Sequence, residues 1–364
     1  MTQYVGFVPV TDEPDGIPTI GVGMLGHGFM GRAHTNGFKK LPYAYWPPAA
    51  RPRLVAVCGR DATRAAEAAR RYGYEGYYTD WRQLLADDRI QLFDNVATDD
   101  LHVEPTIAAL EAGKHVICEK PLARTPAQGR EMIAACEAAG VKLLVAQVVR
   151  FFPEYAAAKG IVERGEIGKV AVVRLTRCAY QPKLAADNWF LDPAKSGGMM
   201  LDLMCHDFDY AQWIAGDVDS VYARSVRSAD PAAPEDYSIA ILRHTSGALS
   251  NVEGAWAYPP PMFRTALEIA GDAGLIEHPA GSSTPLGIHL KAKAGGDAPD
   301  VGLPASPLAE DPYTTQLKHF YNILTGAETT PRVTAQDGLA AVQIAHAAME
   351  SARSGRPVKL SEVQ

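Results

Sequence analysis

Asp202 and His206 are four residues apart in the sequence, and Asp209 follows His206 by three residues. If residues 201–215 form a helix, Asp202 and His206 share one face of it, and Asp209 lies near that face. A carboxylate beside an imidazole raises the basicity of the ring and can fix its orientation, so the pair is a candidate general base for removing a hydroxyl proton. The alternatives are a helix N-cap for Asp202 and a buried structural role for His206. Because no second ligand cluster accompanies these residues, we expect no metal site.

A glycine-rich turn, Gly26-His-Gly-Phe-Met-Gly31, directly follows the apolar run 18–25 and precedes a segment that can continue as a helix. In this setting the GxGxxG pattern is typical of a dinucleotide-binding turn. The first glycine allows the tight turn, the second lets the backbone approach a pyrophosphate, and the third lets the helix pack close to its strand. The N–H groups at the helix N-terminus would bind the phosphates. The alternative is a strand-to-helix turn without a ligand. The residues expected to contact the cofactor here are Gly26, Gly28, Phe29, Met30 and Gly31.

The residue after the second apolar strand, 53–58, distinguishes the two dinucleotides in folds of this kind. An acidic residue there holds the ribose hydroxyls of NAD, whereas an arginine pairs with the 2′-phosphate of NADP. This chain has Gly59 and Arg60 at that place, followed by Asp61. We therefore prefer NADP slightly over NAD. Asp61 is either a helix N-cap or, if it reaches the ribose, the residue that would select NAD.

Apolar strands alternate with helical segments from residue 18 to residue 147, which predicts a doubly wound parallel sheet, the Rossmann architecture. The carboxyl ends of such strands meet at one edge, where ligands bind. Three further loops, 98–102, 119–121 and 147–150, fall on that edge. Lys120 has no evident structural task there, and a cation near a reacting oxygen favours the alkoxide that develops during oxidation of an alcohol.

The pattern changes in residues 148–364, which we expect to form a second, α/β domain. Its strands are joined mostly by short turns, and short connections cannot make parallel crossovers, so an antiparallel sheet is predicted. Two helices, 313–324 and 335–352, are expected near the end of the chain. Residues 1–17 are predicted to be an extended or disordered arm, and residues 281–307 a loop. A further loop is predicted at 41–52, because four prolines disfavour both a helix and a central strand there.

Composition excludes several classes of protein. The formal net charge of the 364 residues is −7 at pH 7, which argues against a nucleic-acid partner. No apolar run approaches the roughly 20 residues that a membrane span needs. The N-terminal residues lack the basic and apolar regions of a secretory signal. The five cysteines form no CxxC pair, which fits reduced thiols in a cytoplasmic protein and argues against structural zinc.

Several motifs together resemble one family of NAD(P)-dependent oxidoreductases, named Gfo/Idh/MocA after glucose–fructose oxidoreductase, inositol dehydrogenase and a rhizopine-catabolism protein. They are the glycine turn with Ala33-His34, the run Ala112-Gly-Lys-His-Val-Ile-Cys-Glu-Lys-Pro121, the Ser196-Gly-Gly and Asp202-x-x-x-His206 motifs, and Gly355-Arg-Pro-Val-Lys-Leu360. The resemblance implies an N-terminal Rossmann domain and a C-terminal α/β domain whose open, mainly antiparallel sheet serves oligomerisation into homodimers or homotetramers. It also implies hydride transfer between NAD(P) and a hydroxyl carbon of a sugar, inositol or related cyclic polyol.

The same resemblance implies roles for individual residues. Lys120, Asp202 and His206 would form the catalytic set. His206 would be the general base on the substrate hydroxyl, Asp202 would orient it or bind the adjacent hydroxyl, and Lys120 would hydrogen-bond the reacting oxygen. The bond before Pro121 is often cis in the family. The further residues expected to contact the cofactor are Gly59, Arg60, Thr98, His102, Glu119 and Lys120. Three residues are expected to contact the substrate: Arg150, because it follows the fifth strand, and Asn188 and Trp189, as a wall against the C–H face of a sugar ring. The alternative for Trp189 is a position in the core.

The chain departs from the family pattern in two places. It has Thr98-Asp99-Asp100 where the family often has Thr-Pro-Asn, and the added carboxylates would alter cofactor contacts or substrate choice. It has Gly59 where members that use NAD often have aspartate. Two alternative functions remain at this point. One is redox-neutral epimerisation or glycoside processing with a tightly held cofactor, and the other is a non-catalytic dinucleotide-binding sensor.

Overall fold

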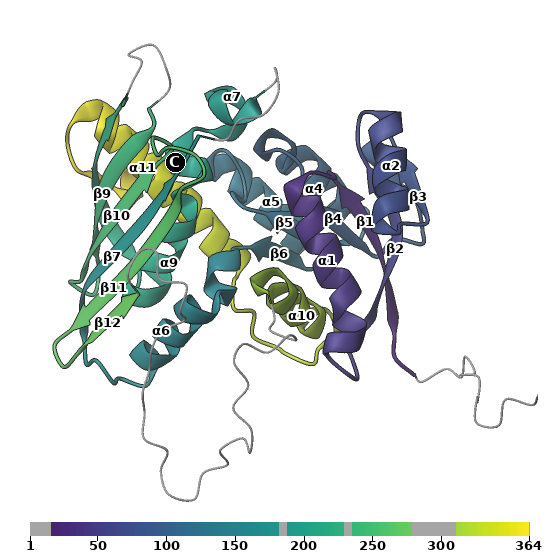
Figure 1. Ribbon diagram of the computed structural model, residues 1–364, viewed down its shortest axis with the longest axis horizontal. Helices are drawn as coiled ribbons and strands as arrows, with labels where there is room; N and C mark the ends of the chain where they lie inside the picture. The colour runs from purple at the N-terminus through teal and green to yellow at the C-terminus, as the bar shows by residue number, and fades with distance from the viewer. Residues whose placement is uncertain (1–15, 182–187, 229–234, 279–310, 364) are drawn as a thin grey trace, which may run out of the picture.

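The structure is a computed structural model that describes residues 16–181, 188–228, 235–278 and 311–363 (Figure 1). Most of the predicted N-terminal arm and the predicted loop at 281–307 lie outside the described residues. Within those residues, the structure has no helix that is both long enough and apolar enough to cross a bilayer.

The first half of the chain folds into a six-stranded parallel sheet with the strand order β3-β2-β1-β4-β5-β6. Its strands are β1 (Thr19–Leu25), β2 (Arg51–Cys58), β3 (Gly76–Tyr78), β4 (Leu92–Asn95), β5 (His115–Glu119) and β6 (Leu143–Ala146). The connecting helices are α1 (Phe29–Ala44), α2 (Ala62–Tyr72), α3 (Trp81–Leu85), α4 (Val103–Glu111) and α5 (Pro126–Ala139). The strand order reverses between β1 and β4, which is the position where sheets of this type bind ligands. The predicted Rossmann domain is therefore confirmed.

The predicted loop at 41–52 is wrong at both ends. Helix α1 continues through Pro42 to Ala44, and β2 already begins at Arg51. Leu41 is buried in the same apolar cluster as Leu317 of helix α10 (Pro312–Thr325), so tertiary packing stabilises the last turn of α1 despite the proline.

The second half forms a seven-stranded sheet with the order β12-β11-β7-β10-β9-β8-β13. The strands are β7 (Val170–Ala179), β8 (Val218–Val226), β9 (Tyr237–His244), β10 (Leu249–Ala255), β11 (Phe263–Gly271), β12 (Leu275–His278) and β13 (Val358–Lys359). The pairs are antiparallel, as predicted, except that β10 runs parallel to β7. This parallel pair arises because the chain leaves β7 through helices and returns by the β8–β9–β10 meander, which lays β10 beside β7 in the same direction.

Helices cover one face of the second sheet and join it to the first domain. Between β7 and β8 lie α7 (Pro193–Ser196), α8 (Met199–Asp202) and α9 (Cys205–Ala215), and α6 (Pro153–Glu163) precedes β7. Helix α11 (Ala335–Ser354) contacts α5 of the first domain as well as α9 and β8 of the second. In Figure 1, α9 and α11 lie between the second sheet and the first domain, whereas the opposite face of that sheet has no labelled helix over it.

The last long helices complete the packing of the first domain. Helix α10 packs against α1, which is far from it in the chain, as Figure 1 shows. One apolar cluster contains residues of β1, α1 and α10, and another extends from the first sheet through α11 to β8. The cores of the two domains are therefore continuous through the C-terminal helices.

Candidate active site

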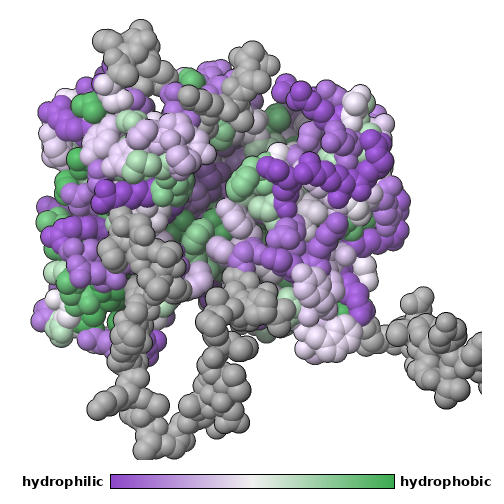
Figure 2. Space-filling view, in the orientation of Figure 1, coloured by the Kyte–Doolittle hydropathy of each residue, from purple (hydrophilic) through white to green (hydrophobic). Residues whose placement is uncertain are grey.

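A cavity of about 850 Å³ lies between the carboxyl edge of the first sheet and the segment that contains α8 and α9. Figure 2 shows the molecule hollowed between its two halves. The glycine turn, the loops after β2, β4 and β5, and residues of β7, α9, β11 and α10 contribute to the lining. From the predicted site, the cavity contains Gly26, Gly28, Phe29, Met30, Gly59, Arg60, Thr98, Glu119, Lys120, Trp189, Asp202 and His206.

The glycine turn has the shape that a dinucleotide pyrophosphate requires. Gly26 has a φ of +100°, and a Cβ there would lie 2.7 Å from the Val96 carbonyl oxygen. A Cβ at Gly31 would lie 2.8 Å from the Gly26 carbonyl oxygen, so only glycine lets α1 begin this close to β1. Gly28 lines the cavity, and a Cβ there would meet nothing within 4 Å. No side chain of the described residues caps α1, so its first N–H groups remain available to phosphates.

The loop after β2 is organised by a contact between Gly59 and His27. A Cβ at Gly59 would lie 2.4 Å from His27 Nε2, so this position is restricted to glycine unless the ring moves. Arg60 is exposed at the cavity. The Asp61 carboxylate caps α2 by accepting hydrogen bonds from the N–H groups of Thr63 and Arg64. The helix-cap alternative for Asp61 is therefore confirmed.

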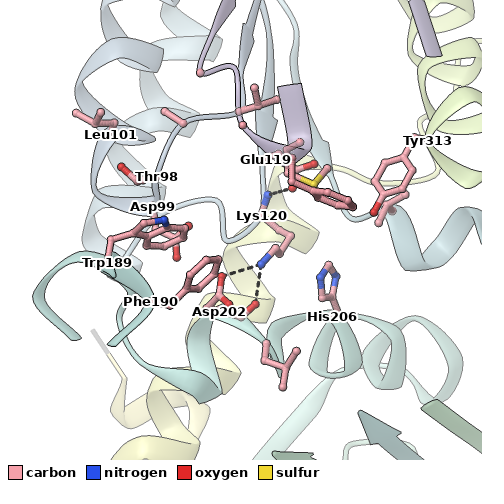
Figure 3. Close-up of a pocket in the computed structure, with 18 of the residues that line it drawn as sticks. Thr98, Asp99, Leu101, Glu119, Lys120, Trp189, Phe190, Asp202, His206 and Tyr313 are labelled. Atoms are coloured by element: carbon pink, nitrogen blue, oxygen red, sulfur yellow. Dashed lines mark hydrogen bonds and ion pairs between the residues drawn. The ribbon is translucent and has the colours of Figure 1, made fainter. Parts of the chain in front are cut away.

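Lys120 and Asp202 form an ion pair at the floor of the cavity (Figure 3). The Lys120 ammonium donates to the Asp202 main-chain oxygen at 2.7 Å and to its Oδ1 at 2.9 Å. Burial alone would lower the pKa of Lys120, but the Asp202 charge outweighs it and keeps that pKa above its ordinary value. The bond between Lys120 and Pro121 is cis, as the resemblance implies.

The predicted Asp202–His206 pair is wrong. Helix α8 ends at Asp202 and α9 begins at Cys205, and the Asp202 carboxylate bonds to Lys120 rather than to the imidazole. His206 Nδ1 has no hydrogen-bond partner among the described residues. Burial, followed by the charges of Lys120 and Arg177, holds the pKa of His206 well below its ordinary value, so the ring is neutral at pH 7. It lines the cavity and lies across it from the loop that carries Lys120 (Figure 3).

Asp207 and Asp209, the two other acidic residues of the segment around His206, each accept hydrogen bonds from a buried arginine. Asp209 accepts from Arg150 Nε at 2.8 Å and from Nη2 at 2.6 Å, and Asp207 accepts from Arg177 Nε at 2.7 Å. Arg150 is only 2% exposed and is not among the residues that line the cavity, so the prediction that it binds substrate is wrong. Among the described residues, no group of three acidic, histidine or cysteine side chains is arranged to hold a metal ion.

Three further predicted contacts, Gly31, His102 and Asn188, lie outside the cavity lining. His102 is fully buried, with Nδ1 2.7 Å from the Pro121 carbonyl oxygen and Nε2 3.3 Å from that of Ala97. It therefore ties the loops after β4 and β5 together instead of contacting a cofactor. Asn188 precedes the short helix η3 (Trp189–Leu191) and is not a lining residue, whereas the Trp189 ring lines the cavity and stacks on Phe190 at 3.9 Å.

Beneath Lys120 lies a buried charged group formed by His34, Asp94 and Glu119. His34 Nδ1 is 3.0 Å from both Asp94 oxygens, and its Nε2 is 3.2 Å from Glu119 Oε1. Burial alone would lower the pKa of His34, but the two carboxylates outweigh it and raise that pKa to about 10. Glu119 Oε2 accepts from the Lys120 backbone N–H at 3.0 Å, so the group fixes the backbone that carries the ammonium. The sequence contained His34 in a family motif but gave no signal of these partners.

Sequence reasoning also missed several cavity residues that come from distant parts of the chain. They are Asp99 after β4, Tyr155 of α6, Arg177 of β7, Thr265 of β11 and Tyr313 of α10. Only Asp99 had a signal, because it interrupts the family's Thr-Pro-Asn pattern. The other four become neighbours only through the tertiary fold.

Comparisons with known proteins agree with this geometry. Residues 20–147 match the model of an oxidoreductase family with an NAD-binding Rossmann fold, and residues 155–277 match that of a GFO/IDH/MocA C-terminal domain. Levoglucosan dehydrogenase from Pseudarthrobacter phenanthrenivorans is 33% identical over 71% of this chain and 73% of its own length. Myo-inositol 2-dehydrogenase from Thermotoga maritima is 29% identical over 94% of this chain and 99% of its own length.

Solved structures give the same result. A levoglucosan dehydrogenase in complex with NADH and levoglucosan superimposes with a TM-score of 0.81 at 27% identity, and the match covers 94% of this chain and 99% of that one. These matches span both domains and include a relative more than 30% identical over two thirds of the chain. The chain therefore belongs to the GFO/IDH/MocA family of oxidoreductases.

Proposed function

We propose that this oxidoreductase transfers a hydride between a nicotinamide dinucleotide and a hydroxyl-bearing carbon of a sugar, inositol or related cyclic polyol. The observation that carries the proposal is the Lys120–Asp202 ion pair beside the neutral His206, in one cavity with a glycine turn suited to a pyrophosphate. Relatives named for levoglucosan and myo-inositol support this class of substrate. A bound nicotinamide would supply the hydride acceptor.

Lys120 would stabilise the reacting oxygen. An ammonium has three N–H donors, and Asp202 accepts from two of them, which leaves the third for a substrate oxygen. Because the pKa of Lys120 stays above its ordinary value, the side chain remains charged and does not act as the base. A fixed positive charge in a cavity of restricted solvent access favours the alkoxide over the neutral alcohol. Asp202 would act by holding this ammonium in place.

His206 would accept the hydroxyl proton. Its imidazole is neutral and its Nδ1 has no hydrogen-bond partner among the described residues, so this ring nitrogen is available to a substrate hydroxyl. The low pKa reflects burial and the positive charges nearby. Negative charge developing on the substrate oxygen would oppose those charges and raise the affinity of the ring for the proton during the reaction.

The function is tested by a panel of inositols, aldoses and anhydrosugars, including levoglucosan and myo-inositol, run with NAD and with NADP. We expect at least one compound to reduce the cofactor, followed by the absorbance of the reduced nicotinamide. Protein that carries nicotinamide through gel filtration without net reduction of added cofactor would favour redox-neutral epimerisation or glycoside processing instead. Absence of turnover across the panel would favour a dinucleotide-binding sensor.

The cofactor is proposed to be NADP, with Arg60 on the 2′-phosphate, because Asp61 is already engaged as the α2 cap. We expect Arg60→Ala to raise the KM for NADP by about 10- to 100-fold, the range of one charge-assisted contact, and to change the KM for NAD less than threefold. Arg71→Ala, an exposed arginine in the last turn of the same helix, is the control. Equal losses for both cofactors, or a wild-type preference for NAD, would contradict the assignment.

We also propose that the protein acts in the cytoplasm as a homodimer or homotetramer. Its five cysteines are unpaired, which suits a reducing compartment. Tyr222, Ile239 and Leu249 are exposed on one face of the second sheet, the face opposite α9 and α11. Such an apolar sheet face is a candidate contact between subunits. Light scattering should give two or four times the chain mass of 39.1 kDa, and a monomer would exclude the proposal.

A further inference from the structure

Asp99 carries a buried carboxyl group that lines the cavity. It is the first residue of the short helix η1 (Asp99–Leu101) after β4, it is only 3% exposed, and it lines the cavity. Its Oδ2 has no hydrogen-bond partner among the described residues. Leaving a buried polar atom unpaired is unfavourable, so such an atom facing a cavity is a candidate for contact with a bound ligand.

The loop does not need the Asp99 side chain for its own structure. The Thr98 hydroxyl donates to Asp100 Oδ1 at 2.6 Å, and only the main-chain oxygen of Asp99 takes part in the turn, where it accepts from the His102 N–H at 3.3 Å. Neither contact involves the Asp99 carboxyl group. Its identity is therefore set by what it meets in the cavity.

The surroundings of Asp99 place it beside the reacting groups. Burial, followed by the Asp202 charge, raises the pKa of Asp99 well above its ordinary value, and the Lys120 charge acts in the opposite sense. Burial and the nearby Asp202 carboxylate therefore both favour the protonated form of the Asp99 carboxyl. Figure 3 shows Asp99 on the same side of the cavity as Trp189 and Phe190, next to the Lys120–Asp202 pair. Helix α7 packs against η1, so the two domains together enclose this corner.

We propose that Asp99 determines substrate specificity by binding a hydroxyl on the ring carbon next to the one that is oxidised. The inference rests on the proposed function, which puts the oxidised carbon's oxygen at Lys120. Its Oδ2 can accept from a substrate hydroxyl, and a carboxyl group that holds a proton also donates through its O–H, which matches a hydroxyl that itself donates and accepts. The Trp189 and Phe190 rings beside it offer an apolar wall to the C–H groups of the same sugar ring.

This arrangement predicts strong discrimination against sugars that lack the vicinal hydroxyl. A site built around a hydrogen bond to a substrate hydroxyl rejects an analogue without it far more strongly than an apolar pocket does, because the site's own polar group is then left unpaired.

The test compares the wild type with Asp99→Leu and Asp99→Asn. The substrate is whichever of levoglucosan and myo-inositol the wild type oxidises faster, together with its monodeoxy analogues. We expect wild-type kcat/KM to fall about 100-fold for one vicinal monodeoxy analogue, and Asp99→Leu to lose about the same factor on the parent sugar. For Asp99→Leu, kcat/KM on the deoxy analogue should then be less than threefold below its value on the parent sugar. Asp99→Asn keeps a donor and an acceptor and should stay within about tenfold of the wild type.

Several controls separate the possible outcomes. Asp88→Leu, an exposed aspartate at the opposite edge of the first sheet, should leave all parameters unchanged. The Kd of NADPH and NADH, measured by fluorescence, should be unchanged in both Asp99 variants, which also establishes that they are folded. If Asp99→Leu and the deoxy analogue together lower kcat/KM by the product of their separate losses, the inference is overturned while the proposed function stands. A tenfold weaker cofactor affinity of the Asp99 variants would have the same meaning. A wild type that oxidises no compound of the panel would overturn the proposed function and this inference with it.

Discussion

Replacement of Lys120 by methionine is expected to reduce kcat by about 10³-fold while the protein still binds its dinucleotide. Methionine keeps most of the length of the side chain but removes the charge that we propose stabilises the developing alkoxide, and loss of one such preorganised donor typically costs 10²- to 10³-fold. The Asp202 carboxylate loses its ion-pair partner at the same time, which adds to the defect. The glycine turn is untouched, so cofactor affinity should change less than threefold.

The measurement is the steady-state rate on a substrate identified by the panel, with cofactor Kd from fluorescence titration and folding from thermal unfolding. Lys142→Met, an exposed lysine at the start of β6, is the matched control and should behave as the wild type. Lys120→Arg keeps the charge and should recover part of the activity. A Lys120→Met enzyme with near wild-type kcat would rule out the assigned role.

His206→Asn is expected to lower kcat for alcohol oxidation by about 10²- to 10⁴-fold, the usual contribution of a positioned general base. Asparagine fills similar space but cannot take up the proton. Added imidazole should restore part of the rate, which a purely structural defect would not allow. His115→Asn, at the far end of β5 from Glu119, serves as the control.

The pH profile provides a second readout for the same residue. A base must be unprotonated to act, and it loses activity as the pH falls through its pKa. Because the pKa of His206 lies well below its ordinary value of 6.5, wild-type kcat/KM should show no decline between pH 8 and pH 6.5, and the acid limb should appear only below that range. An acid limb centred above pH 6.5 would mean that another group is the base.

The fold was largely predictable because its signals are local. The helices predicted at 313–324 and 335–352, for example, are α10 and α11, whose bounds differ from the prediction by at most two residues at either end. The order of strands and helices in the first domain follows from simple alternation. The errors arose where distant contacts outweigh local preference. Pro42 lies inside α1 because α10 packs on that turn, and β10 runs parallel to β7 because a meander returns the chain to the centre of the sheet.

The same distinction between local signals and distant contacts applies to the residues of the site. Lys120 and His206 were found because each belongs to a short motif, and both line the cavity. Their partners were not predictable, because hydrogen bonds such as that between Lys120 and Asp202 join residues 82 positions apart. Arg150 follows a strand at the ligand edge, and its position alone suggested a substrate contact. Only the fold brings Asp209 within 2.6 Å of it and closes it off from the cavity.

The packing of α10 on α1 has a consequence for how the chain reaches its native state during translation. The apolar cluster that contains Met24, Phe38 and Leu41 also contains Leu317 and Phe320. The ribosome adds these last two close to 300 residues after Met24. Domains generally fold as units during synthesis, the N-terminal one first. Here we expect the nascent N-terminal sheet to keep part of its apolar surface uncovered until α10 has been synthesised, so that the first domain completes its folding only after most of the second has emerged.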